Sequence, residues 1–414
     1  MSCAGTHSGS RGLFYCSSSL AGSDRRLRKA SNAKGNPVKF PSKILAVQVN
    51  YYFDPNGDVV FVAEAGGSVT ALKLSTNELS ATPQGAQAPL TSLAFHASKI
   101  LPDPVTTMLV FAGSWDKSVW RYTFRFASES SQGRTVTEHS SFPAHGDFVK
   151  CLLVAQTPDK QDILISGGAD GDIRFWTLDG RPLGTLKPNC RGIECLAIDP
   201  LSSPASPIVM FSTSKQEIFY FTVPESSKIT ADHLGMSAPI LAHQTSVYKL
   251  HFDDDGDLWT ASADKTAKQL SRNDNWKVGT VLEHPDFVRD VVTHDKYGWV
   301  ITACRDEEVR VWNKATGRLH HVFSGHYEEV TGLCLTRDLV ISVSIDATLR
   351  RWSLAPADLQ KAVDEAKNPD RAEQEAPEPQ ADFSMLTEEE EAELRALMES
   401  EEHDVLERMA MDEQ

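Results

Sequence analysis

The sequence lacks the features that would place it in a membrane or in the common enzyme classes. No apolar run approaches the ~18 residues needed to span a bilayer, and the N-terminus has no apolar core of a secretory signal. No Gly-x-Ser-x-Gly elbow, His-Glu-x-x-His motif, P-loop or dinucleotide fingerprint occurs. We therefore expect a protein that is not an enzyme, needs no cofactor and binds no membrane.

Metal-binding patterns are also missing. The seven cysteines form no Cys-x-x-Cys pair and no Cys/His spacing that suits zinc: Cys3, Cys16, Cys151, Cys190, Cys195, Cys304 and Cys334. The acidic run at residues 253–257 (DDDGD) lacks the closing Glu of a calcium loop, and we interpret it as a solvated hairpin turn. We expect no metal site. The odd number of unpatterned cysteines indicates free thiols in a reducing compartment, the cytoplasm or the nucleus or both.

Positive charge is scarce in the body of the chain. The net charge is −16 over 414 residues, but residues 1–40 carry +6 and residues 361–414 carry −14. The middle is mildly acidic and has no basic footprint of the kind that duplex binding requires. We therefore expect that the chain does not bind nucleic acid directly.

The sequence does contain an internal repeat. Each copy has a His, then a short apolar strand, then a second strand that ends in small residues and an Asp. An aromatic residue, usually Trp, stands six positions after the Asp. The clearest copies run from His145 to Trp176, from His284 to Trp312 and from His326 to Trp352.

Four less regular units complete the pattern. Two keep part of the motif: His243 and Asp264 with Leu270 in place of Trp, and Asp116 and Tyr122 without the His. Two degenerate units, residues 59–74 and 208–223, keep the strand rhythm alone. Together these make seven units with a step of about 40–54 residues, the period of a four-stranded propeller blade.

This arrangement resembles the WD40-repeat family, of the fungal type, over roughly residues 36–355. The resemblance implies an all-β fold, a seven-bladed β-propeller in which each blade buries both faces against its neighbours. In the family a His, a Ser or Thr, the turn Asp and the Trp form a hydrogen-bonded chain that locks each blade. By position, these residues are His145, Ser166, Asp170 and Trp176; His243, Thr260 and Asp264; His284, Thr302, Asp306 and Trp312; and His326, Ser342, Asp346 and Trp352.

The His–Asp pairs also suit general-base catalysis, but their repetition in phase favours the structural role, so we expect no catalytic residues. The family closes its ring by pairing the two ends of the chain. The last unit lacks an outer strand, and residues 36–42 (NPVKFPS) are predicted to supply it.

The two ends of the chain differ from its body. Residues 1–35 are expected to form a disordered basic extension, whose cluster RRLRK at residues 25–29 suits either nuclear localisation or a basophilic kinase acting on Ser31. Residues 356–384 are predicted to be a charged linker, and residues 385–414 an acidic amphipathic helix. Its apolar side includes Leu394, Leu397, Met398 and Val405. We expect this helix either to dock on a partner or to remain a solvated tail.

Candidate partner-binding residues belong to two positional classes that face the narrow surface of the ring in the family: the residue before the turn Asp, and the start of the first strand. They are Trp115, Phe148, Lys150, Phe287, Arg289, Arg305, Glu328 and Glu329. Exposed aromatic and Arg side chains dominate binding hot spots. The alternative for Phe148 and Phe287 is packing beneath loops.

Taken together, the sequence predicts a non-enzymatic scaffold or subunit of a multiprotein complex, with a monomeric propeller that binds other proteins. One alternative is a substrate receptor of a ubiquitin ligase. The Trp-Asp-x-Arg signature of such receptors is missing, since Thr, Asn and Ser follow Trp176, Trp312 and Trp352. Another alternative is an accessory subunit of an RNA-modifying or ribosome-assembly complex.

Overall fold

A computed structural model describes residues 32–51, 54–83, 85–99, 106–126, 135–229 and 235–367. The basic cluster, Ser31 and the predicted acidic helix lie outside these residues. No helix within the described part of the chain is long and apolar enough to cross a membrane.

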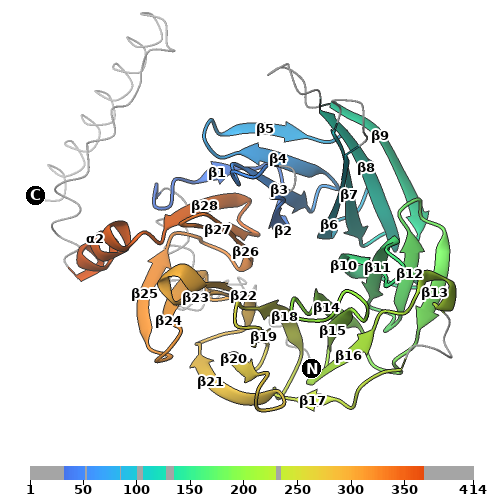
Figure 1. Ribbon diagram of the computed structural model, residues 1–414. Coiled ribbons are helices and arrows are strands. Elements are labelled where there is room, and N and C mark those ends of the chain that lie inside the picture. Colours follow the sequence, from blue (N-terminus) through green and yellow to red (C-terminus); the bar gives the residue numbers. More distant parts are fainter. Residues whose placement is uncertain are drawn as a thin grey trace, which may run out of the picture. The chain divides into compact units, whose positions relative to one another are not determined.

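The described residues form seven four-stranded antiparallel sheets around a central axis, which confirms the predicted seven-bladed propeller (Figure 1). Blades 1 to 3 contain β2 (Ile44–Val49), β3 (Val59–Glu64), β4 (Val69–Lys73) and β5 (Glu78–Ala81); β6 (Leu90–Lys99), β7 (Thr106–Ser114), β8 (Ser118–Phe126) and β9 (Thr135–Pro143); and β10 (Val149–Gln156), β11 (Asp162–Gly168), β12 (Ile173–Thr177) and β13 (Pro182–Leu186).

The remaining four blades repeat this order from the axis outwards. Blades 4 and 5 contain β14 (Ile193–Ile198), β15 (Ile208–Thr213), β16 (Glu217–Thr222) and β17 (Ile240–Leu241); and β18 (Val247–Phe252), β19 (Leu258–Ser262), β20 (Thr266–Ser271) and β21 (Lys277–Glu283). Blades 6 and 7 contain β22 (Val288–His294), β23 (Trp299–Cys304), β24 (Glu308–Asn313) and β25 (Leu319–Ser324); and β26 (Val330–Thr336), β27 (Leu339–Ser344), β28 (Thr348–Ser353) and β1 (Val38–Lys39). The 3₁₀ turns η1 (Ser226–Lys228) and η3 (Asp295–Tyr297) lie in connections.

The core lies between blades rather than within them. In β11, Ile163 and Ile165 pack with Phe211 and Phe221 of blade 4, whereas Leu164 packs with Phe111 of blade 2. Successive side chains of a strand point to opposite faces of its sheet. The sequence of a strand that is buried on both faces is therefore continuously apolar. This geometry explains the unbroken Ile-Leu-Ile segment of the repeat.

Pairing of β1 with β28 closes the ring, as predicted from residues 36–42. Val38 pairs with Leu349 and Lys39 with Thr348. Figure 1 shows β1 beside β28, although the two strands lie near opposite ends of the described part of the chain. The last blade therefore takes its outer strand from the first described residues.

The closure begins four residues earlier than predicted. The Arg350 guanidinium donates to Asn32 Oδ1 (2.9 Å) and to the Lys34 carbonyl, and the Arg351 amide donates to the Gly35 carbonyl (2.7 Å). Gly35 has φ +72°, and a Cβ there would lie 2.8 Å from the Trp352 ring. Residues 32–35, assigned from sequence to the disordered extension, are thus part of the ring closure.

The predicted linker also begins with ordered structure. Helix α2 (Pro356–Lys367) occupies its first twelve residues. Proline suits the first position of a helix, Asp358 lies in the first turn, and the Ala, Leu, Gln, Lys and Glu that follow are good helix formers. The charge content of this segment obscured these helix signals.

Removal of the closing strand should destabilise the whole ring. Deletion of residues 34–42 exposes the edge of β28 and removes the buried Val38 and Phe40 side chains. We expect the free energy of unfolding to fall by about 3 kcal/mol or more, on the scale of burying two large apolar side chains. Denaturant unfolding measures the change, with a deletion of equal length inside residues 1–31 as the control. An unchanged unfolding midpoint would refute the closure.

Candidate functional site

Blades 3 and 7 contain the complete hydrogen-bonded series of His, Ser, Asp and Trp. In blade 3, His145 Nδ1 donates to Asp170 (2.9 Å), the Ser166 hydroxyl bonds His145 Nε2 (2.8 Å), and the Trp176 indole donates to Ser166 (2.9 Å). In blade 7 the same contacts join His326, Asp346, Ser342 and Trp352, at 2.9, 2.8 and 2.8 Å. Burial lowers the pKa of both imidazoles, so each His is neutral at neutral pH.

Blade 5 keeps this chain without the Trp. His243 Nδ1 contacts Asp264 (2.9 Å) and Nε2 contacts the Thr260 hydroxyl (2.7 Å), while the Thr266 hydroxyl donates to Asp264 (2.5 Å). Leu270, at the position of Trp, is fully buried. Apolar packing fills the place of the indole.

Blade 6 departs from the prediction at Asp306. His284 Nε2 contacts Thr302 (2.8 Å) and the Trp312 indole donates to Thr302 (2.9 Å), but His284 Nδ1 contacts the Leu282 carbonyl (3.1 Å). Asp306 instead accepts two hydrogen bonds from Arg310, at 3.0 and 2.5 Å.

Proline explains this correction. In the other three chains the residue after the His donates its backbone N–H to the Asp: Gly146 to Asp170 (2.7 Å), Gln244 to Asp264 (3.1 Å) and Tyr327 to Asp346 (3.2 Å). Pro285 occupies this position in blade 6 and has no N–H to donate. Without that bond the Asp306 carboxylate pairs with Arg310.

Blades 1, 2 and 4 lack the His of the repeat and are stabilised by other contacts. In blade 4, Phe221 takes the register position of the Trp, and Phe211 stacks on Phe219 with centroids 5.3 Å apart. In blade 1, the buried Glu64 accepts hydrogen bonds from the Ser42, Ser68 and Thr70 hydroxyls, at 3.1, 3.2 and 2.5 Å. In blade 2, Asp116 accepts from the Trp120 indole (2.8 Å), and Tyr122 is fully buried.

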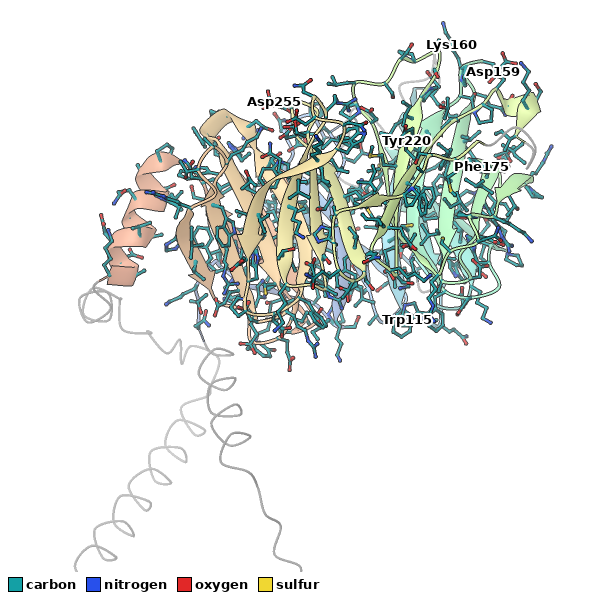
Figure 2. All side chains as sticks on the ribbon, turned by 90° about the horizontal axis from the view of Figure 1, so that it is seen from below. Trp115, Asp159, Lys160, Phe175, Tyr220 and Asp255 are labelled. Atoms are coloured by element: carbon teal, nitrogen blue, oxygen red, sulfur yellow. The ribbon has the colours of Figure 1, made fainter. Side chains whose placement is uncertain are left out.

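The turns between the second and third strands, together with the loops leading into each next blade, form one face of the ring. We call it the Trp115 face; Figure 2 shows Trp115 at one edge of the ring and Asp159, Lys160 and Asp255 at the opposite edge. Backbone bonds tie these turns down: Trp115 N donates to Pro89 O (3.0 Å) and Ala169 N to Phe148 O (2.8 Å). Each of these turns is therefore tied to the loop that leads into the same blade.

The Trp115 face carries an exposed aromatic pair. Trp115 is 46% exposed and Phe148 is 39% exposed, and their rings stack at 5.1 Å with an interplanar angle of 17°. Phe148 is thus exposed rather than packed beneath a loop. On the same face, in blade 6, Arg305 is exposed. Its guanidinium lies over the half-buried Phe287, 5.2 Å from the centroid of the phenyl group.

Three of the other sequence candidates on this face take part in ion pairs. Lys150 pairs with Glu194 (2.5 Å), and Arg289 pairs with Glu329 and lies over the Tyr248 ring at 4.5 Å. Glu328 is half-buried. Lys150, Glu194, Tyr248 and Arg289 line the central channel, a cavity of about 450 Å³ formed by the first strands of the blades. Leu394, Leu397, Met398 and Val405 lie outside the described residues.

Part of this chain matches the family model described as WD domain, G-beta repeat, at residues 136–177, 237–269 and 276–313. A WD repeat-containing protein of Schizosaccharomyces pombe is 32% identical over 356 residues, which cover 83% of this chain and 88% of that protein. The chain belongs to the WD-repeat family. The WD40 beta propeller domain of Doa1, a crystal structure, resembles the fold of this WD-repeat protein with a TM-score of 0.58 and 16% identity, over 78% of this chain and 98% of that one.

A further relative has a name that describes a complex. The tRNA (guanine-N(7)-)-methyltransferase non-catalytic subunit wuho of Drosophila grimshawi is 28% identical over 165 residues, which cover 39% of this chain and 41% of that protein. The similarity is local, because it covers less than half of either protein.

Sequence reasoning missed an ion pair inside the channel of this WD-repeat protein. Lys249 Nζ lies 3.4 Å from Asp290, which also accepts the backbone N–H of Leu333 (2.9 Å), so blades 5, 6 and 7 are joined at the axis. The Asp290 carboxylate raises the pKa of Lys249. Lys249 and Asp290 each occupy the third position of the first strand in two neighbouring blades. An alignment of the repeats shows this shared position.

The acidic turn at residues 253–257 surrounds a side chain from the next blade. Lys314 Nζ lies 3.1, 3.0 and 2.5 Å from the carboxylates of Asp253, Asp255 and Asp295. These three acids form a cluster of possible metal ligands. The Lys314 ammonium supplies the positive charge among these three carboxylates, and it joins blade 6 to blade 5.

Acid should weaken the fold through His284. Burial, and then the nearby Arg310, lowers the pKa of His284 to about 4. In the unfolded chain the imidazole has a pKa of ~6.5, so it binds a proton at a higher pH than in the folded protein. The contribution of the neutral His284 to the free energy of unfolding is therefore fully present above pH ~6.5 and is lost as the pH falls towards 4. We expect a loss of about 2 kcal/mol at about pH 5 relative to about pH 7.5.

Urea unfolding of His284→Gln at these two pH values measures this contribution. The amide should keep a partner for Thr302, and the variant should lose about 2 kcal/mol less than the unsubstituted chain on acidification. His320→Gln is the matched control, since His320 is exposed. An unchanged pH dependence in His284→Gln would contradict the assignment.

Proposed function

We propose that this WD-repeat protein is a non-catalytic subunit or scaffold of a multiprotein complex and that it docks partner proteins on the Trp115 face. The observation that carries the proposal is the stacked, exposed pair of Trp115 and Phe148 on turns held by backbone hydrogen bonds. Large aromatic residues on rigid elements are favourable anchors, because little side-chain entropy is lost on binding.

The placement of the His and Asp residues supports a non-catalytic role. His145 is 7% exposed and His326 is 1% exposed, and both ring nitrogens of each imidazole contact groups within their own blade. A general base must reach the substrate proton directly or through one water molecule. These imidazoles stabilise blades instead of facing solvent.

A second candidate function is an accessory subunit of a tRNA-modifying enzyme. The relatives named as tRNA (guanine-N(7)-)-methyltransferase non-catalytic subunit wuho favour it; in Drosophila persimilis, identity is 42% over 74 residues. It shares with the first candidate a propeller that docks a partner protein, and it specifies that this partner is catalytic. We propose a monomeric propeller within the hetero-complex, in the cytoplasm or the nucleus or both.

Affinity purification of the full chain with quantitative mass spectrometry tests the docking role. Trp115→Ala and, separately, Arg305→Glu should each reduce recovery of a stoichiometric partner at least tenfold, the effect of losing one hot-spot side chain. Tyr220→Ala is the matched control, since Tyr220 is an aromatic residue with 36% exposure away from the Trp115 edge (Figure 2). Recovery that is equal for all three variants would reject the docking face.

The same purification separates the two candidates. A methyltransferase recovered in stoichiometric amount would favour the accessory-subunit role, and other partners would favour a general scaffold. A version that ends at Lys367, after helix α2, tests whether the predicted acidic helix at residues 385–414 contributes to the contact.

A further inference from the structure

Exposed cations lie on three consecutive blades of the Trp115 face. Lys117 is in the β7–β8 turn, Lys187 and Arg191 are in the β13–β14 loop, and Lys215 is in the β15–β16 turn; all four are exposed. We call these four residues the basic arc. Such a cluster is unexpected in a chain of net charge −16.

The carboxylates of the same turns and loops accept hydrogen bonds from neighbouring groups of the protein. Asp116 accepts from the Trp120 indole, Asp147 from the Phe148 amide, Asp172 from Arg174 and Glu194 from Lys150, at 2.8, 2.8, 3.0 and 2.5 Å. Within the described part of the chain, Lys117, Lys187 and Arg191 make no ion pair, and Lys215 lies 3.9 Å from Glu217. The cations of the arc are therefore available to an incoming partner.

The basic arc is continuous with the aromatic pair. The Lys117 carbonyl accepts the backbone N–H groups of Ala144 and His145, at 2.9 and 3.0 Å, in the loop that carries Phe148. The next turn touches the following loop, because a Cβ on Gly171 would lie 2.5 Å from the Cys190 carbonyl oxygen, beside Arg191. Cations and exposed aromatic rings thus share one rigid strip from blade 2 to blade 4.

We propose that the basic arc and the Trp115–Phe148 pair bind an acidic protein segment that carries a bulky apolar side chain. The apolar side chain packs on the exposed aromatic rings, and the carboxylates of the segment pair with Lys117, Arg191 and their neighbours in the arc. The inference rests on the proposed docking function and specifies the chemistry of the partner.

The charge pattern favours a peptide over a nucleic acid. Single-stranded nucleic acid also stacks on aromatic rings, but its evenly spaced phosphates require a groove of continuous positive charge. Asp116, Asp147 and Asp170 lie in the same turns and loops, so the positive charge of the arc is not continuous. A peptide can place its carboxylates beside the cations and uncharged residues beside these acids.

Fluorescence anisotropy of the full chain with three labelled probes tests the proposal. The probes are a peptide of alternating Glu and Leu around a central Phe, the same peptide with Lys in place of Glu, and oligo-uridine. The acidic peptide should bind, with an affinity that falls as salt is added. The basic peptide and oligo-uridine should bind at least tenfold more weakly.

Variants locate the contact. Lys117 has φ +73°, a conformation that Gly adopts without cost, so Lys117→Gly removes the charge without straining the turn. Lys117→Gly combined with Arg191→Ala should weaken binding of the acidic peptide about fivefold, and Trp115→Ala about tenfold. Lys160→Glu is the matched control: Lys160 is exposed and has φ +63°, and it lies at the opposite edge of the ring (Figure 2).

The proposal is overturned if the acidic peptide does not bind, or if Lys160→Glu weakens its binding as much as the arc variants do. Tighter binding of oligo-uridine through the same residues would also overturn it and assign the arc to nucleic acid. If the peptide fails to bind while Trp115→Ala still loses its co-purified partner, the acidic chemistry is rejected and the docking function stands. Thermal unfolding of each variant verifies that the ring is intact.

Discussion

Pairing of the first described residues with β28 is the constraint on which the rest of the propeller depends. Each blade buries its apolar faces against its neighbours, so an open ring would expose the faces between blades 7 and 1. The closure combines the β1–β28 ladder with contacts near the axis, where the Thr331 hydroxyl donates to the Ile44 carbonyl (2.8 Å). A closed ring fixes the positions of all seven blades, and therefore of the loops on the Trp115 face.

The blades show how different residues satisfy the same local demand. Buried polar groups must be paired, and the His–Ser–Asp–Trp chain does this in blades 3 and 7. Blade 6 keeps the His, Thr and Trp contacts, but its Asp306 accepts hydrogen bonds from Arg310, because Pro285 has no N–H to donate. Blade 4 removes the polar groups and packs Phe211 on Phe219 instead. Each blade must be closely packed and its buried polar groups must be hydrogen-bonded, and different sets of residues meet these two requirements.

The repeat motif predicted the fold because its spacing reports blade geometry directly. The pattern from His145 to Trp176 recurs in phase and indicates seven units, and the resemblance to the WD40-repeat family implies the propeller and its closing strand. The Asp306 contact was mispredicted because a motif specifies residue types and does not include the backbone donor beside them. The Lys249–Asp290 pair and the basic arc were missed because they join residues of different blades, whose distances depend on the assembled ring. The net charge of −16 concealed the arc, because it says nothing of where the cations lie in the folded ring.

Hydrogen exchange of the chain alone and of the chain in its purified complex tests the docking face most directly. Exchange slows where a partner covers or rigidifies backbone amides. The account predicts added protection in peptides spanning residues 113–118, 144–149 and 187–192, with none at residues 157–161 and 253–257 on the opposite face. Protection confined to the opposite face, or to neither face, would contradict the assignment of the Trp115 face as the place where partners bind.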